Sequence, residues 1–142
     1  MIYKSTYFKI AELVAPEILL TEKEDDLWEK FGEKRIRHLD LLRENFSDKI
    51  AVNGNGRKYS GLRTMDCKEG APKSKHKFYE AFDLHAVNDK DNVKLKKLLG
   101  MILINPEKYG ISRIEDPDVT FKGNWLHVEI INNWNGFHIF KP

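Results

Sequence analysis

Histidines and carboxylates occur at three places in the sequence, with spacings compatible with a metal site. Asp83 and His85 lie two residues apart in a predicted strand, so their side chains share one face. His127 and Glu129 share a face of another predicted strand for the same reason. His76 precedes the first of these strands, and it can reach the same metal as Asp83 only if the chain bends between them. Two imidazoles and one carboxylate would leave a fourth zinc position open, which distinguishes catalytic from structural zinc sites.

Such a site has the components needed to hydrolyse an amide bond. Zinc lowers the pKa of water towards neutrality and polarises a carbonyl group. A nearby carboxylate can accept the proton of that water and pass it to the leaving amine, and Glu129 is the candidate for this role. The same residue types also allow a plainer interpretation, in which His76 is a solvated loop residue and His127 a half-buried strand residue.

Composition and charge are typical of a single globular domain, which we expect to span residues 1–142. Hydrophobic residues make up 41% of the chain and charged residues 32%, as in ordinary soluble proteins. Basic and acidic residues number 24 and 22, a balance too even to favour nucleic acid as a partner. Cys67 is the only cysteine, so the chain has no internal disulfide and no thiolate zinc cluster. Any metal site must therefore use His, Asp and Glu, and the oligomeric state stays open.

The sequence lacks the signals of a membrane or exported protein. No stretch approaches the roughly 18 consecutive apolar residues of a membrane-spanning helix. Residues 1–16 mix Lys4, Lys9 and Glu12 with apolar residues, unlike the continuous apolar segment of a secretory signal. We therefore expect a protein that is made in the cytoplasm, without a signal peptide and without a membrane span.

Hydrophobic periodicity predicts an α+β fold. A first helix is expected from Thr21, which has capping-box spacing to Glu24, to about Phe46. A second helix is expected after Asn88 or Asp89, and Pro106 should end it. Short strands are expected near residues 49–53, 59–64, 80–87, 111–114, 125–130 and 137–140. Helices before and between such strands predict a small antiparallel sheet with flanking helices.

Four elements in order resemble the zinc D-Ala-D-Ala peptidase family. That family includes D-alanyl-D-alanine carboxypeptidases, phage endolysins that cut L-Ala–D-Glu bonds and, more distantly, the hedgehog signalling domain. Its first motif reads Ser-x-His, two residues, Gly, x, Ala, x, Asp, and Ser74, His76, Ala81 and Asp83 match it within the segment that begins at Gly70. Residues 60–64 look like its Ser-Gly-Tyr-Arg-Ser element, residues 109–113 and 125–129 look like its closing strands, and residues 7–13 are similar to the starts of phage members.

The resemblance implies a hedgehog/DD-peptidase-like fold and a zinc ion held by His76, Asp83 and His127. It implies that Arg63 contacts a carbonyl or carboxylate of the substrate, which suits its planar donor fork. The implied protein is a hydrolase of cell wall degradation, a zinc metallopeptidase acting on peptidoglycan stem peptides. It would act at the bacterial cell wall as a phage or prophage lysis protein, either endolysin-like or D,D-carboxypeptidase-like. His85 is expected to pack in its strand or to lie beside the site.

Two positions depart from the family pattern. Tyr79 stands where the family has glycine, and a positive φ there would strain a tyrosine. Asn124 stands where several members carry the catalytic glutamate, and it cannot accept a proton. One branch instead carries an acid two residues after the last histidine, which Glu129 fits, while Asp116 and Asp118 are alternatives. These departures leave a second function open, a zinc-containing binding or phage structural module without catalysis.

Overall fold

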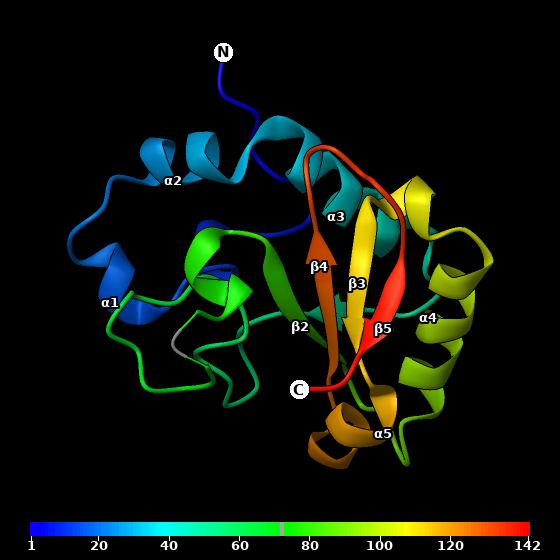
Figure 1. Cartoon of the computed structure of the whole chain (residues 1–142). Coiled ribbons are helices and arrows are strands. Elements are labelled where there is room, and N and C mark those ends of the chain that lie inside the picture. The colour runs from blue at the N-terminus through cyan, green and yellow to red at the C-terminus, as the bar shows by residue number, and fades with distance from the viewer. Residues whose placement is uncertain (72) are drawn as a thin grey trace.

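A five-stranded sheet lies at the centre of the computed structural model, which describes residues 1–71 and 73–142 (Figure 1). Pro72, which belongs to the family-like segment before His76, lies outside the described residues. The strand order is β1-β2-β4-β3-β5. The strands are β1 (Ile50–Ala51), β2 (Ala81–Ala86), β3 (Ile111–Glu115), β4 (Leu126–Ile130) and β5 (His138–Phe140). The α+β class and five of the six expected strands are confirmed.

The sheet is mixed, so the prediction of an antiparallel sheet is wrong at its last strand. β1, β2, β4 and β3 pair with their neighbours in antiparallel fashion, whereas β5 runs parallel to β3. After β4 the chain reverses and returns, but β2 and β3 already occupy both edges of β4. The returning strand therefore pairs with the far edge of β3, and this makes it parallel to β3 (Figure 1).

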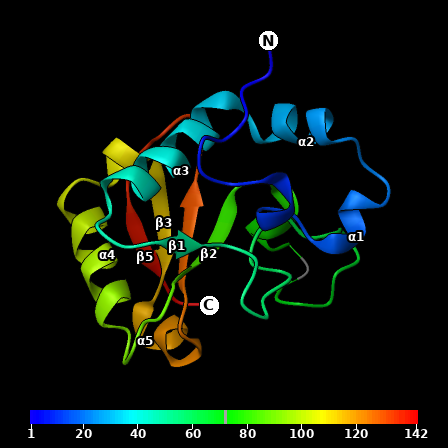
Figure 2. The same ribbon diagram turned by 180° about the vertical axis from the view of Figure 1, so that it is seen from behind.

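Helices cover one face of the sheet and leave the other face to polar side chains. Seen from behind, α3 lies in front of the sheet and α4 lies along its side (Figure 2). In β4, Leu126, Val128 and Ile130 are fully buried and belong to the continuous hydrophobic core. Because side chains alternate along a strand, His127 and Glu129 point to the opposite face.

The helical segments are η1 (Ile10–Glu12), α1 (Pro16–Leu19), α2 (Glu24–Phe31), α3 (Glu33–Asn45), η2 (Lys75–Phe78), α4 (Val93–Ile104), η3 (Pro106–Tyr109), α5 (Pro117–Thr120) and η4 (Phe121–Gly123).

The long helix expected between residues 21 and 46 is divided in two. Gly32 has a φ of 87°, which ends α2 and turns the chain into α3. The predicted capping box does not form, because Lys23 and not Thr21 precedes the first turn of α2. None of the described helices is both long and apolar enough to cross a membrane.

Residues 59–64, expected as a strand, form no regular strand but pair briefly with the N-terminal segment. The Leu62 N–H donates to the Leu13 carbonyl at 2.8 Å, and the Ala15 N–H donates to the Leu62 carbonyl at 2.7 Å. A Cβ atom added to Gly61 would lie 2.1 Å from the Leu13 carbonyl oxygen. Only glycine fits at this backbone contact, and the contact fixes the Gly61 carbonyl beside His76.

Gly61→Ala is expected to destabilise the protein by about 1–3 kcal/mol, because the added methyl group must displace backbone rather than a flexible side chain. Gly100→Ala is the matched control. Gly100 lies inside α4 and its Cβ position is open, so alanine there should stabilise the helix by about 0.8–1 kcal/mol. Urea unfolding of the two variants measures both changes. Equal stabilities for the two variants would contradict the backbone contact.

Candidate metal centre

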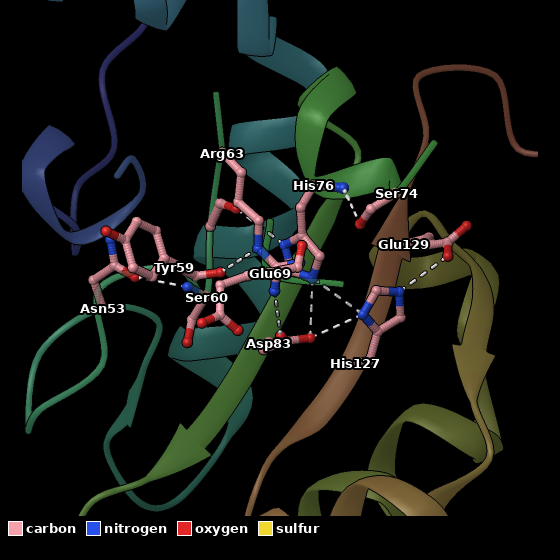
Figure 3. Close-up of polar contacts among 11 residues, drawn as sticks. Asn53, Tyr59, Ser60, Arg63, Glu69, Ser74, His76, Asp83, His127 and Glu129 are labelled. Carbon is pink, nitrogen blue, oxygen red and sulfur yellow. Dashed lines mark hydrogen bonds and ion pairs between the residues drawn. The ribbon is translucent and has the colours of Figure 1, made fainter. Parts of the chain in front are cut away.

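The structure brings His76, Asp83 and His127 together on the polar face of the sheet (Figure 3). Asp83 and His127 lie directly opposite each other on β2 and β4, and His76 comes from η2 just before β2. Asp83 Oδ1 lies 3.2 Å from His76 Nε2 and 2.8 Å from His127 Nδ1, and the two nitrogens are 3.3 Å apart. The three residues implied as ligands therefore form one compact triangle.

A tight reversal of the chain allows His76 to reach Asp83. The Ser74 hydroxyl accepts a hydrogen bond from the His76 N–H at 3.3 Å and begins η2. Tyr79 then adopts a left-handed conformation with a φ of 67°. This is the strained conformation considered for Tyr79 from the sequence, with a cost of roughly 1–2 kcal/mol. The ring of Tyr79 packs edge-on against Phe31, with centroids 5.0 Å apart, and this contact offsets part of the strain.

In each histidine, one ring nitrogen points away from the triangle. The hydrogen bond that this outer nitrogen makes determines whether the nitrogen facing the triangle carries a proton or a lone pair. His76 Nδ1 lies 3.0 Å from the Gly61 carbonyl oxygen, which can only accept, so Nδ1 carries the proton and Nε2 offers a lone pair. His127 Nε2 lies 3.0 Å from a Glu129 carboxylate oxygen, so Nε2 donates and Nδ1 offers a lone pair in the neutral ring. The tautomers are thus assigned from the hydrogen-bond partners.

This donor set fits a metal cation. Two lone pairs and a carboxylate oxygen converge within 2.8–3.3 Å, and they repel one another unless a positive charge lies between them. Metal bonds of about 2.0–2.1 Å in tetrahedral geometry give ligand separations of roughly 3.3 Å, close to the observed edges. His76, Asp83 and His127 can therefore hold three corners of a tetrahedron.

The pKa values of Asp83 and His127 also indicate that the site favours a positive charge. Burial alone would raise the pKa of Asp83, but hydrogen bonds from His127 and His76, donated when the nitrogens that face Asp83 are protonated, outweigh burial and hold that pKa far below its ordinary value. Burial alone would lower the pKa of His127, but its hydrogen bonds with Asp83 and Glu129 raise that pKa to about 9. The site thus attracts either a proton or a metal cation.

Arg63 lies behind the second oxygen of Asp83. Its Nη2 is 3.5 Å from Asp83 Oδ2, while Nε donates to the Tyr59 carbonyl at 2.7 Å and Nη1 donates to the Glu69 carbonyl at 3.1 Å (Figure 3). These contacts hold the guanidinium at the wall of the cleft, where it orients the Asp83 carboxylate. The contact of Arg63 with a substrate stays a prediction.

Glu129, the candidate proton acceptor, lies on the outer side of His127. Its Oε2 contacts Nε2 of the ring, whereas Asp83 contacts Nδ1, so the two carboxylates lie on opposite sides of the imidazole (Figure 3). The other oxygen, Oε1, lies 3.3 Å from Nη1 of Arg113. The sequence patterns do not single out Arg113, which lies in a strand with both polar and apolar residues.

The remaining candidates lie away from the triangle. Asp116 caps α5 by accepting the Asp118 N–H at 3.0 Å, and Asp118 is exposed. Asn124 is exposed in a left-handed conformation with a φ of 66°. His85 is buried, and its Nε2 contacts the side-chain amide of Asn55 at 3.0 Å. His85 therefore packs in its strand, the first of the two roles considered for it.

An open cleft of about 760 Å³ lies over the triangle. Its lining carries more basic than acidic side chains: Arg57, Lys58, Arg63, Lys73, Lys75 and Arg113 against Glu69, Asp83, Glu115 and Glu129. Three aromatic side chains, Tyr59, Trp125 and Phe140, also line it. A cleft of this kind suits an extended ligand that carries negative charge.

No family model, curated protein or solved structure matches this chain. Fold and geometry nevertheless define a class: an α+β protein with a mixed sheet and a candidate His-Asp-His metal centre at the floor of an open cleft.

Proposed function

We propose that this protein is a zinc-dependent peptidase that hydrolyses amide bonds in peptidoglycan stem peptides. The observation that supports this most is the triangle of His76 Nε2, Asp83 Oδ1 and His127 Nδ1, with its free side towards the cleft. Nitrogen and carboxylate ligands suit zinc, although other divalent ions also accept them. When bound, zinc supplies a Lewis acid that polarises the scissile carbonyl and activates water. The likeness of residues 60–64, 74–83 and 125–129 to the zinc D-Ala-D-Ala peptidases supports the substrate class.

The basic side of the cleft is suited to the carboxylates of a stem peptide. Arg113 is partly exposed in the cleft and presents a planar donor fork, and Arg63 adds positive charge at the cleft wall. Lys73 and Lys75 add charge at its rim. These groups would orient the peptide so that one amide lies over the metal centre. Which bond is cut, and whether cutting is endo- or carboxypeptidase-like, depends on where those carboxylates bind.

Glu115 is the proton acceptor that the geometry favours. Ile114 pairs with Val128 across β3 and β4, so the next pair in this antiparallel register places Glu115 opposite His127, on the cleft face. Histidine and arginine side chains engage the carboxylates of Asp83 and Glu129. Within residues 1–71 and 73–142, by contrast, no hydrogen bond or ion pair engages the half-buried carboxylate of Glu115.

Purified protein loaded with zinc is expected to release peptide fragments from muropeptides, detected by mass spectrometry. Removal of the metal with a chelator should abolish release, and added zinc should restore it, because the metal supplies the water activation. The fragment masses would identify the bond. Bound zinc without fragments from any muropeptide would contradict the peptidase proposal.

A second function is favoured by Asn124, which stands where several peptidases of the resembling family carry an acid. In this alternative the domain keeps its metal but serves as a binding or phage structural module. Sedimentation of the protein with purified cell walls, without release of any peptide, would support it.

The proposed cell-wall substrate also implies a place of action. We propose that the protein acts at the bacterial cell wall as part of phage or prophage lysis and is made in the cytoplasm. Recovery of the protein from the medium of unlysed cultures would contradict this.

A further inference from the structure

We propose that Glu129 is a positioning residue, which holds His127 for metal binding and does not move a proton in the reaction. The inference rests on the metal site of the proposed function but does not require peptidase activity. Arg113 from β3 and Phe140 from β5 complete the arrangement.

The first step is the orientation of the His127 ring. An imidazole can offer either nitrogen to a metal, and the hydrogen bond on the other nitrogen decides which one. His127 and Glu129 lie on the same face of β4, and Glu129 Oε2 accepts from Nε2–H at 3.0 Å. Glu129 is only 3% exposed, so water does not compete for this bond. Nδ1 is thereby left to face Asp83 and His76.

The second step is the orientation of Glu129 itself. A buried carboxylate must be paired, and Arg113 lies directly opposite Glu129 in the β3–β4 register. Nη1 of Arg113 lies 3.3 Å from Oε1 of Glu129. The guanidinium carbon of Arg113 lies 4.0 Å from the centre of the Phe140 ring, and that ring packs edge-on against His127 with centroids 5.7 Å apart. Four side chains, His127 among them, thus form a closed ring of contacts.

This ring leaves Glu129 unsuited to proton transfer. Its two oxygens are held by His127 and Arg113, and they lie beyond the imidazole when viewed from the triangle (Figure 3). A carboxylate on the outer nitrogen of a metal-binding histidine instead fixes the ring and makes it a stronger ligand. Glu129 in this role sets the affinity of the site for its metal.

The test is the zinc affinity of the whole chain, measured by competition with a chromophoric chelator. Glu129→Gln is expected to weaken zinc binding by roughly 10–100-fold, because a neutral amide holds His127 less firmly and its N–H₂ opposes Arg113. Glu69→Gln is the matched control: it removes the same charge from the same cleft at an exposed side chain that does not touch His127. Its zinc affinity should stay within about threefold of the parent.

Two further measurements keep the inference testable if Glu129→Gln folds poorly. Arg113→Lys should also weaken zinc binding several-fold, because lysine lacks both the fork and the flat surface over Phe140. NMR of the His127 ring nitrogens in zinc-loaded protein should show Nδ1 bound to the metal and Nε2 protonated in the parent chain, and a mixture of the two binding modes in Glu129→Gln. Unchanged zinc affinity and binding mode in Glu129→Gln would overturn the inference. Zinc binding without peptide release would instead refute the peptidase proposal alone.

Discussion

Asp83→Asn is expected to abolish the stabilisation of this protein by zinc. Asp83 Oδ1 is the atom of the triangle that contacts both imidazoles, at 3.2 and 2.8 Å. Asparagine keeps the shape of the side chain but removes the only formal negative charge among the three proposed ligands. The two histidines would then bind zinc as a neutral pair, with one ligand of much reduced strength.

The effect is measured as the change in melting temperature on adding zinc. At a zinc concentration of 100 times Kd, the parent chain gains about 2.7 kcal/mol. For a chain of this size the gain corresponds to a rise of roughly 5–10 °C. Asp83→Asn should show no rise, whereas Asp116→Asn, which alters an acid that caps α5 outside the cleft, should show the parental rise. A full zinc-dependent rise in Asp83→Asn would remove the metal centre from consideration.

Local patterns in the sequence were sufficient to predict the faces of the strands but not their neighbours. Alternation places Asp83 on the polar face of β2 and His127 on the polar face of β4. Their meeting depends on β2 and β4 being adjacent, with Asp83 opposite His127, and this pairing is a long-range property of the fold. The resemblance to a known family supplied that information, since periodicity alone does not contain it.

The direction of β5 and the break at Gly32 were not predictable for two different reasons. β5 is parallel to β3 because both edges of β4 are occupied, so its direction depends on the order in which the other strands pair. Gly32 is tolerated within a helix at a modest cost, so its presence does not require a break. The φ of 87° at Gly32, between α2 and α3, is therefore a finding of the structure alone.

Glu129 illustrates why the face of a strand does not by itself determine the role of a residue. Sharing a face with His127 is compatible with contact to the metal and equally with contact to the histidine itself. The outcome depends on Arg113, which pairs with Glu129 only because the β3–β4 register shifts between Ile111 and Arg113. Such an irregularity leaves no recognisable pattern in the sequence.

The largest kinetic effect is expected from Glu115→Gln. General acid–base catalysis contributes typically 10²–10⁴-fold, so removal of the proposed proton acceptor should lower kcat by about that factor. KM and zinc affinity should change little, because the amide keeps the size of the side chain and Glu115 contacts neither His127 nitrogen.

Glu69→Gln provides the comparison for Glu115→Gln, since Glu69 also lines the cleft but is exposed and lies on a loop. It should retain most of the parental kcat. Muropeptide hydrolysis by the two variants, at saturating zinc, separates proton transfer from the general effect of charge in the cleft. If Glu115→Gln kept the parental kcat, the proton would have to leave by another route. In that case the position of Glu115 opposite His127, across β3 and β4, would have no role in catalysis.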